Sequence, residues 1–268
     1  MLTVAMIADY LEHFAPPRLA EEWDNVGLLV GNAARPVERM MTCLTLTPDS
    51  VGEAVAEQAD LVVTHHPLPF RPLRRVTSDS PEGRLLLDLI EARIAVYSPH
   101  TAFDSTGRGV NQRLAEGIGL DAIEPLVAGA YDPAIGTGRC GKLAEPLKLA
   151  ELAERTGRFV SIETVQFVGD PDRAINKVAV GCGSAGELLA IARDLHCACF
   201  VTGEARFHSC LEAEASGIAL ILVGHFASER FALEQLAELL ASQFPSVVVW
   251  ASRRERDPLR SVQTNCPS

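Results

Sequence analysis

The sequence lacks the cysteine spacing of a disulfide framework or a zinc ribbon. Its seven cysteines are an odd number, they form no C-x-x-C pair, and the closest two are Cys197 and Cys199. Paired cysteines are typical of small secreted domains, whereas scattered thiols are typical of a reducing compartment. We therefore expect reduced thiols and a cytoplasmic protein.

Long apolar runs and an excess of basic charge are also missing. Apolar stretches such as 218–223 are far shorter than the roughly 20 residues needed to span a bilayer, and residues 1–12 do not have the pattern of a secretory signal. The formal net charge is -11. Because nucleic acids and anionic membranes repel such a chain, we expect neither as a partner. One basic cluster, formed by Arg71, Arg74 and Arg75, is either a solvated loop or a contact for a phosphate group.

The composition is that of a folded globular protein, with 47% hydrophobic and 22% charged residues. Strands and helices are expected to alternate along most of the chain. The predicted strands are 39–46, 61–64, 94–97, 177–180, 198–202 and 219–223. The predicted helices are 2–14, 50–58, 82–92, 110–117, 148–155, 187–195, 207–215 and 228–244. This alternation predicts an α/β fold with mostly parallel sheets and flanking helices.

The chain is expected to form two similar α/β lobes around a central cleft. The first lobe covers residues 1–128 and the second covers 177–268, with the two intertwined as one domain. Segment 129–176 is rich in Gly and Pro and is expected to connect them, with a strand on either side of its helix at 148–155. The polar tail after Trp250 is expected to fray.

A weak internal duplication supports this division. Segment 44–53 aligns with 178–187, segment 61–66 with 199–204, and segment 96–104 with 220–229. Each half therefore has one strand that ends in Thr and polar residues, and a second that ends in His-x-x-x-acid. Since sites in parallel sheets form at the carboxyl ends of strands, these polar residues are predicted to meet in one cleft.

The pair His65 and His66 closes an apolar strand just before Pro67. Adjacent residues on an extended chain point in opposite directions, so two neighbouring metal ions would accept this pair more easily than one ion. The alternative is a hydrogen-bonded histidine pair at a turn.

The two His-x-x-x-acid segments place an imidazole and a carboxylate four residues apart. His225 and Glu229 fall at the start of a predicted helix, where this spacing puts both side chains on one face. A salt bridge at the helix start is the alternative reading. His100 and Asp104 repeat the spacing, and Asp104 is either a helix cap in a loop or a carboxylate that bridges two cations.

Imidazole and carboxylate ligands suit Zn²⁺, Fe²⁺, Mn²⁺ or Ni²⁺ and do not select among them. Two such ions per chain would polarise a substrate and activate water. His100 and Glu204 are the candidate catalytic residues, either as proton-transfer groups or as groups that orient the ligands.

A competing motif lies between a predicted strand and a helix. Gly181-Cys-Gly-Ser-Ala-Gly186 is a literal GxGxxG, and Glu204 ends the next strand, where a ribose-binding acid would lie. This pattern indicates a dinucleotide-binding oxidoreductase. We favour a tight turn that holds an anion near the metal ions, because the dinucleotide reading leaves the histidines unexplained.

Several short motifs resemble those of the Nif-three-like dinuclear metal centre family, whose bacterial members are named GTP cyclohydrolase 1 type 2 homologues. They run in order along nearly the whole chain, at 23–28, 64–67, 97–104, 201–204 with His208, and 224–229. The length of the chain resembles that of the compact members of the family, which lack a central insert domain. The departures are Ala102 and Phe103 where relatives have Asn-Leu, and Glu204 where relatives have an aspartate or similar polar group nearby.

The resemblance implies a specific ligand set and assembly. The implied metal ligands are His65, His66, Asp104, His225 and Glu229, with Asp104 and Glu229 serving both ions. It also implies a ring-shaped homohexamer with the sites facing an internal cavity.

The implied activity is metal-dependent hydrolysis of a nucleotide such as GTP or of another small molecule. Two alternatives stay open: a metal-binding or metal-delivery protein with little turnover, and a structural adaptor.

Overall fold

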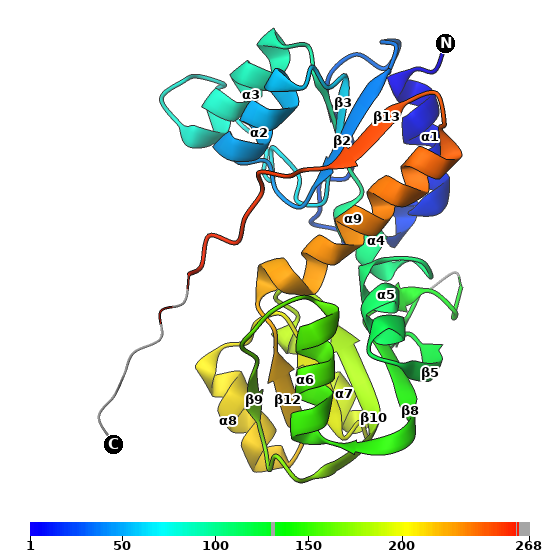
Figure 1. Ribbon diagram of the computed structural model, residues 1–268, viewed down its shortest axis with the longest axis vertical. Coiled ribbons are helices and arrows are strands. Elements are labelled where there is room, and N and C mark those ends of the chain that lie inside the picture. Colours follow the sequence, from blue (N-terminus) through cyan, green and yellow to red (C-terminus); the bar gives the residue numbers. More distant parts are fainter. Residues whose placement is uncertain (130–131, 261, 263–268) are drawn as a thin grey trace.

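The computed structural model describes residues 1–129, 132–260 and 262, and its first sheet has five strands (Figure 1). In spatial order these are β1 (Gly27–Val30), β4 (Ala95–Ser98), β3 (Leu61–Thr64), β2 (Arg39–Cys43) and β13 (Val248–Ala251). β1 is antiparallel to β4, and the other four strands are mutually parallel.

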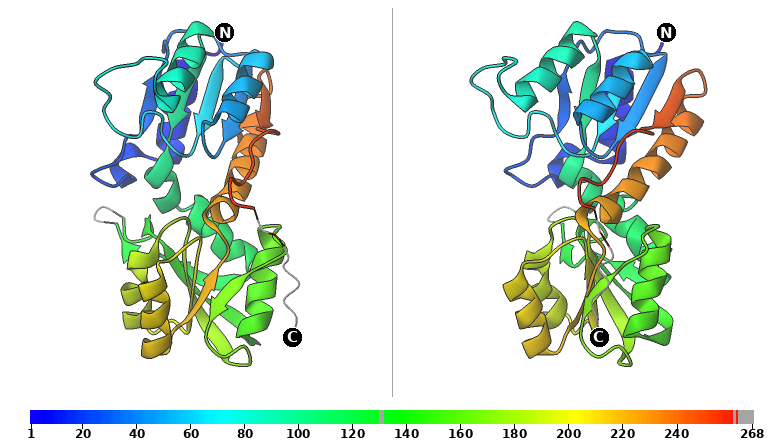
Figure 2. Two further views of the ribbon diagram at one scale, coloured as in Figure 1. Left: turned by 90° about the vertical axis from the view of Figure 1, so that its left-hand side faces the viewer. Right: turned by 60° about the vertical axis from the view of Figure 1, so that its left-hand side comes forward.

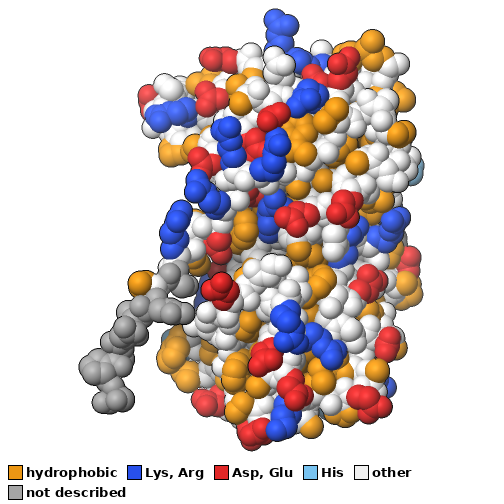
Figure 3. Space-filling model, in the orientation of Figure 1, with side chains coloured by type: hydrophobic (Ala, Val, Ile, Leu, Met, Phe, Trp, Pro, Cys, Tyr) orange, Lys and Arg blue, Asp and Glu red, His pale blue; other side chains and the backbone are white. Residues whose placement is uncertain are grey.

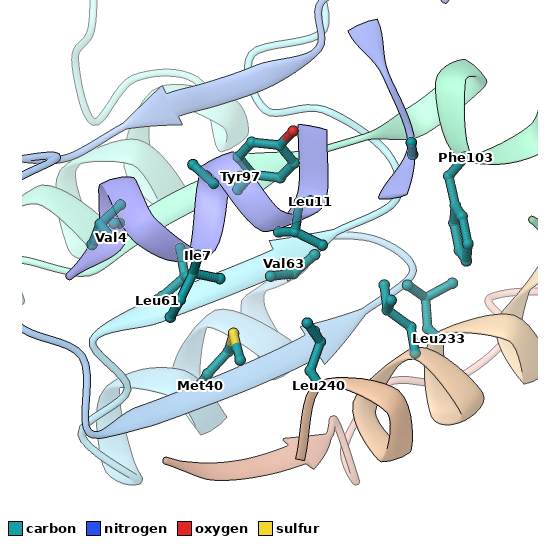
Figure 4. Packing of buried hydrophobic residues seen from close by; sticks show 14 of the residues in the cluster. Val4, Ile7, Leu11, Met40, Leu61, Val63, Tyr97, Phe103, Leu233 and Leu240 are labelled. Carbon is teal, nitrogen blue, oxygen red and sulfur yellow. The ribbon is translucent and has the colours of Figure 1, made fainter. Parts of the chain in front are cut away.

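Helices cover both faces of this first sheet, as its apolar strands require. α1 (Val4–Phe14) and α9 (His225–Gln243) pack on one face, and α2 (Pro48–Ala56) and α3 (Pro81–Glu91) on the other. Side chains alternate along β3, so Leu61 and Val63 pack in the cluster with α1 and α9 whereas Val62 packs in the other cluster. Figure 4 shows side chains of the first cluster from α1 (Ile7, Leu11), from the strands (Met40, Leu61, Val63) and from α9 (Leu233, Leu240).

The second sheet has six strands. In spatial order these are β5 (Leu120–Glu124), β8 (Arg139–Lys148), β10 (Ala174–Gly181), β11 (Cys199–Thr202), β12 (Ala219–Leu222) and β9 (Gln166–Val168). β10, β11 and β12 are parallel, and the other three strands pair antiparallel. α5 (Val110–Gly117) and α6 (Leu149–Phe159) cover one face, and α7 (Leu189–Asp194) and α8 (Phe207–Ser216) the other.

The predicted α/β class is confirmed, and both sheets are mixed rather than parallel throughout. β2-β3-β4 with antiparallel β1 has the same order as β10-β11-β12 with antiparallel β9, and the segments aligned as a duplication begin within these strands or, for 44–53, directly after β2. The boundaries expected at 128 and 176 do not coincide with the sheets. Segment 129–176 contributes β8, α6 and β9 to the second sheet, and β13 returns to the first.

The two sheets lie at opposite ends of the molecule, with α4 (His100–Ser105), α5 and the start of α9 between them (Figures 1 and 2). Arg139 of β8 is 1% exposed and joins this region to the second sheet. Its guanidinium donates to the carbonyls of Ser105 and Thr106 at the end of α4, at 3.0 and 2.8 Å. A cation is favoured at this carboxyl end of a helix, where the carbonyls lack partners.

The expectation that the chain frays after Trp250 is wrong for residues 251–255. Ala251 completes β13, and the carboxylate of Glu53, 2% exposed, accepts hydrogen bonds from the Ser252 hydroxyl and from the amides of Arg253 and Arg254 at 2.7–3.1 Å. Hydrophobic patterning does not detect such a segment, because a buried charge and backbone amides hold it in place.

Three further observations on the described residues concern surface charge, the cysteines and the length of apolar helices. Acidic and basic side chains are interspersed on the face seen in Figure 3. The six cysteines that the structure describes are free thiols. Within the described ranges, no helix is both long enough and apolar enough for a membrane crossing.

We predict that Glu53→Gln lowers the free energy of unfolding at neutral pH by about 2–3 kcal/mol, because charge-assisted hydrogen bonds to the tail are lost. Burial opposes ionisation of Glu53, but the hydrogen bonds from the tail prevail and lower its pKa below 4.5. Its stabilising effect is therefore present above that pH and is lost as the pH falls through the lower folded value. Urea unfolding at several pH values measures the difference.

The control for Glu53→Gln is Glu38→Gln, at an exposed position. Equal stability of Glu53→Gln and the wild type at neutral pH would contradict the assigned role of the tail.

Candidate metal centre

The first two candidate ligands lie just beyond the carboxyl end of β3. Backbone pairing continues past the strand, because the amides of His65 and His66 donate to the carbonyls of Cys43 and Leu44 at 3.0 and 2.8 Å. Ser98 donates to the His65 carbonyl at 2.6 Å. The His66 Nδ1 atom lies 2.7 Å from the Thr45 hydroxyl, so its Nε2 atom is directed elsewhere.

The two adjacent rings do not point in opposite directions, contrary to the expectation from an extended chain. The ring centroids of His65 and His66 are 5.2 Å apart, with an interplanar angle of 52°. The chain leaves strand geometry after Thr64 and bends before Pro67, which brings both imidazoles to the same cluster.

The short helix α4 carries His100 and Asp104, so Asp104 lies in a helix and not in the expected loop. Asp24 fixes the orientation of His100: its Oδ1 atom lies 2.7 Å from His100 Nδ1, and its Oδ2 atom accepts from the amide and the hydroxyl of Thr101. The side chain of Asp24 is fully buried. Burial opposes its ionisation, but the hydrogen bonds from His100 and Thr101 prevail and lower the pKa of Asp24 to about 2.

The second sheet supplies the remaining candidates. α9 begins at His225, three residues before the predicted start, so His225 and Glu229 occupy its first two turns. Glu204 follows the carboxyl end of β11, and its Oε1 atom lies 3.0 Å from His225 Nδ1. Glu204 thus holds His225 as Asp24 holds His100, except that the Glu204 side chain is 51% exposed.

These elements bring all five predicted ligands together. The Glu229 Oε2 atom lies 3.2 Å from the Nε2 atoms of both His66 and His225. The His65 Nε2 atom lies 3.6 Å from Asp104 Oδ1 and 4.0 Å from Glu229 Oε1. Two overlapping sets have ligand atoms within 4.8 Å of one another and share one imidazole: His65, His66 and His100, and His66, His225 and Glu229.

Burial and neighbouring charges shift the pKa values of the residues in the cluster. Burial, and then repulsion from Glu229, raise the pKa of Asp104 well above its ordinary value. Burial lowers the pKa of His65 well below its ordinary value, so this imidazole is neutral. The Glu229 carboxylate raises the pKa of His225 to about 9 against the effect of burial, and the surrounding histidines keep the pKa of Glu229 itself low.

The cluster fits divalent cations. In the described part of the chain, five buried side-chain polar atoms have no hydrogen-bond partner, and four of them belong to this site: His65 Nδ1, His65 Nε2, Asp104 Oδ1 and Glu229 Oε2. Buried polar atoms in folded proteins normally have partners, and unpaired ones concentrated at one point indicate a ligand. Neutral imidazole and carboxylate are the donors that zinc and other transition metals bind.

The glycine turn at 181–186 packs against the cluster. The Cys182 and Gly183 amides donate to Asn111 Oδ1 and Ser228 Oγ, at 2.7 and 2.9 Å. A Cβ atom on Gly183, whose φ is +64°, would lie 2.2 Å from Glu229 Oε1. These two amides are therefore unavailable to an anion, and a pyrophosphate would face the Glu229 carboxylate. The turn instead makes room for Glu229.

Asp24 and Thr45 were missed as functional residues. Asp24 lies in the Trp23-Asp24-Asn25 motif, but its partner His100 is 76 positions away and only the fold joins them.

His208, which was named with the motif at 201–204, lies exposed on α8. It is absent from the ligand sets found in the described ranges.

Comparison with known proteins gives a consistent result along the whole chain. The sequence profile of Duf34/NIF3 (NGG1p interacting factor 3) matches residues 2–258. A Clostridium acetobutylicum protein named GTP cyclohydrolase 1 type 2 homolog is 32% identical over 256 residues, covering 95% of this chain and 90% of its own. The NIF3 homolog of Schizosaccharomyces pombe is 34% identical over 271 residues, covering 94% and 95%.

Solved structures show the same fold. A Staphylococcus aureus protein superposes with a TM-score of 0.89 at 25% identity, covering 97% of this chain and 99% of its own. Reduced HcgD of Methanocaldococcus jannaschii gives 0.81 at 28% identity, covering 93% and 97%.

We predict that Asp24→Asn weakens metal binding by about 10- to 100-fold if His100, which lies in the three-imidazole set, is a ligand, because partners that orient a ligating imidazole contribute this much to affinity. Competition with a chelator measures the affinity, and circular dichroism verifies the fold. Asp121→Asn, at an exposed position, is the control. Unchanged affinity in Asp24→Asn would exclude His100 from the site.

We also predict that Gly183→Ala abolishes metal binding, because the new methyl group would displace Glu229. Gly217→Ala is a matched control: its φ is +71°, but no atom lies within 4 Å of an added Cβ. Both changes are expected to cost about 1 kcal/mol of stability through backbone strain. Equal metal content of the two variants, measured by elemental analysis, would show that the contact with Glu229 is unimportant.

Proposed function

Because the chain belongs to the Duf34/NIF3 family, we propose that it is a dinuclear metal-dependent hydrolase acting on a nucleotide or a related small molecule. The supporting observation is the group of unpaired buried atoms on His65, Asp104 and Glu229, which lies between the strand ends of two sheets. Carboxylates at that depth need cations to balance their charge, and the unpaired ring nitrogens of His65 need a partner.

We assign the five predicted residues as ligands of two ions, His65, His66, Asp104, His225 and Glu229. When bound, a pair of divalent cations supplies Lewis acidity and lowers the pKa of water. Glu229 lies close to imidazoles of both sets, which supports a bridging position for it, whereas Asp104 lies close to His65 and its bridging position is proposed from the family resemblance.

The two residues first considered catalytic receive different roles. His100 belongs to the three-imidazole set, and Asp24 engages its Nδ1 atom. We therefore propose His100 as a sixth ligand and not as a proton-transfer group. Glu204 orients His225 and is half exposed, so its carboxylate can also accept a proton from the attacking water.

The substrate is proposed from the names of relatives. Several bacterial relatives are named GTP cyclohydrolase 1 type 2 homolog. The corresponding reaction adds water to C8 of the guanine ring and cleaves the C8–N9 bond. A second water then hydrolyses the resulting formamide, which releases formate and leaves an amine on the pyrimidine ring. The proposed groups supply what this reaction requires, an activated water molecule and a residue that accepts its proton.

We predict two metal ions per chain in protein purified without added metal, and loss of both metal and activity in His65→Ala and Glu229→Ala. Elemental analysis gives the stoichiometry, and formate release from GTP gives the activity. One ion or none in the wild type would reject the dinuclear centre. Formate release by the wild type that does not exceed that of His65→Ala would reject GTP hydrolysis. If the wild type also binds its metal weakly and exchangeably, a metal-delivery protein would be favoured.

We also propose the homohexamer that the family resemblance implies. Light scattering coupled to size exclusion gives the mass of the assembly. An intact assembly that keeps its protein partners in both ligand variants would favour the structural-adaptor alternative.

A further inference from the structure

Two exposed aromatic rings lie beside the candidate metal centre. Trp23 is 60% exposed and Phe70 is 44% exposed, and their ring centroids are 5.9 Å apart. Each ring also lies close to His100, with centroid distances of 6.0 Å for Trp23 and 6.1 Å for Phe70. The pair therefore flanks the one imidazole of the cluster that is held by Asp24.

The exposure of these rings is not a result of loose loops. The residue after Trp23 is Asp24, whose buried carboxylate is bound to His100 and Thr101. The next residue, Asn25, donates from its Nδ2 atom to the carbonyl of Pro69 at 2.7 Å, immediately before Phe70. Both backbones are thus fixed to the site and to each other, and the two rings are left facing solvent.

We propose that Trp23 and Phe70 form a stacking platform for a planar aromatic heterocycle, and that this ring is part of the substrate of the metal centre. The inference rests on the proposed function and specifies its substrate class. Aromatic faces bind nucleobases and similar rings through stacking, which tolerates different ring identities. Fixed aromatic side chains also lose little conformational freedom when they bind.

The position of the platform distinguishes it from other exposed apolar side chains. Phe207 is 72% exposed but lies at the start of α8, where its neighbouring ring is that of His208. Trp23 and Phe70, in contrast, are in edge contact with a residue whose ligand atoms lie within 4.8 Å of those of His65 and His66. A ring seated on the platform is therefore adjacent to the groups that would activate water.

The test uses the fluorescence of Trp23 in metal-loaded protein. The chain has two tryptophans, so Trp250→Phe leaves Trp23 as the reporter. GTP, guanosine and a pterin are each titrated, with inorganic triphosphate as the probe that lacks a ring. We expect quenching by the compounds with rings and none by triphosphate.

Phe70→Ala tests the second ring of the platform. It should weaken binding of GTP by about 5- to 150-fold, the range for loss of one stacking contact, with unchanged metal content. Phe207→Ala is the matched control and should bind GTP as the wild type does. Because Trp250→Phe can perturb folding, the KM for GTP of Phe70→Ala is also measured in the chain that retains both tryptophans.

The possible outcomes separate this inference from the proposed function. Quenching without formate release supports the platform and rejects hydrolysis of GTP. Formate release with an unchanged KM in Phe70→Ala rejects the platform and leaves the hydrolase intact. Equal responses to GTP and triphosphate, or no response to any ring compound, overturn the inference. A smaller assembly in Phe70→Ala with unchanged GTP binding would show that a second copy of the chain covers these rings.

Discussion

A carboxylate that is only 4% exposed needs positive charge close by, and Glu229 lies where the strand ends of two sheets meet. Its neighbour Asp104 is also a carboxylate, and the innermost imidazole, His65, is neutral because it is fully buried. Within the protein, protonated His225 offers compensation. Removing one partner of a buried charged group costs several kcal/mol, so this cluster constrains everything packed around it. Two features follow from this constraint. Residue 183 has no side chain, which leaves room for Glu229, and the carboxylate of Asp24 holds His100 in place.

The constraint also accounts for the path of the chain between the sheets. α9 starts directly after β12 of the second sheet, but its later turns pack in the core of the first sheet, and β13 then pairs with β2. The Thr42 hydroxyl donates to the carbonyl of Leu233 in α9 at 2.7 Å, deep in that core. Glu255 accepts from the amides of Leu44 and Thr45, and Thr45 in turn contacts His66. The segment after the last strand therefore supports a histidine of the site, which explains why it does not fray.

The sequence predicted the α/β class, most helices and a list of candidate site residues, because these leave local signals, and the family resemblance then selected the five proposed ligands from that list. Apolar periodicity marks elements such as β3 and α5, and polar residues directly after apolar strands mark strand ends. The mixed character of the sheets was not predictable, since the strands expected on either side of helix 148–155 carry no local signal of their direction or of the sheet they join. Nor was the clamp between Asp24 and His100, because a hydrogen bond across 76 positions depends on the completed fold. The start of α9 was placed too late, since Gly224 precedes a helix without a side-chain cap.

Exposure of the side chains indicates from which side the site is reached. It rises from 1% for His65 to 26% for His66, 36% for His225 and 51% for Glu204. A cation held by His66, His225 and Glu229 would therefore face solvent more than one held by His65. Three imidazoles, His66, His100 and His225, have Nδ1 engaged by an oxygen, which leaves Nε2 for the cluster. Of the two carboxylates that orient imidazoles in this way, Asp24 is sealed and ionised at all ordinary pH values, whereas Glu204 meets solvent. This difference in exposure supports the proposed proton-transfer role of Glu204 and the proposed positioning role of Asp24.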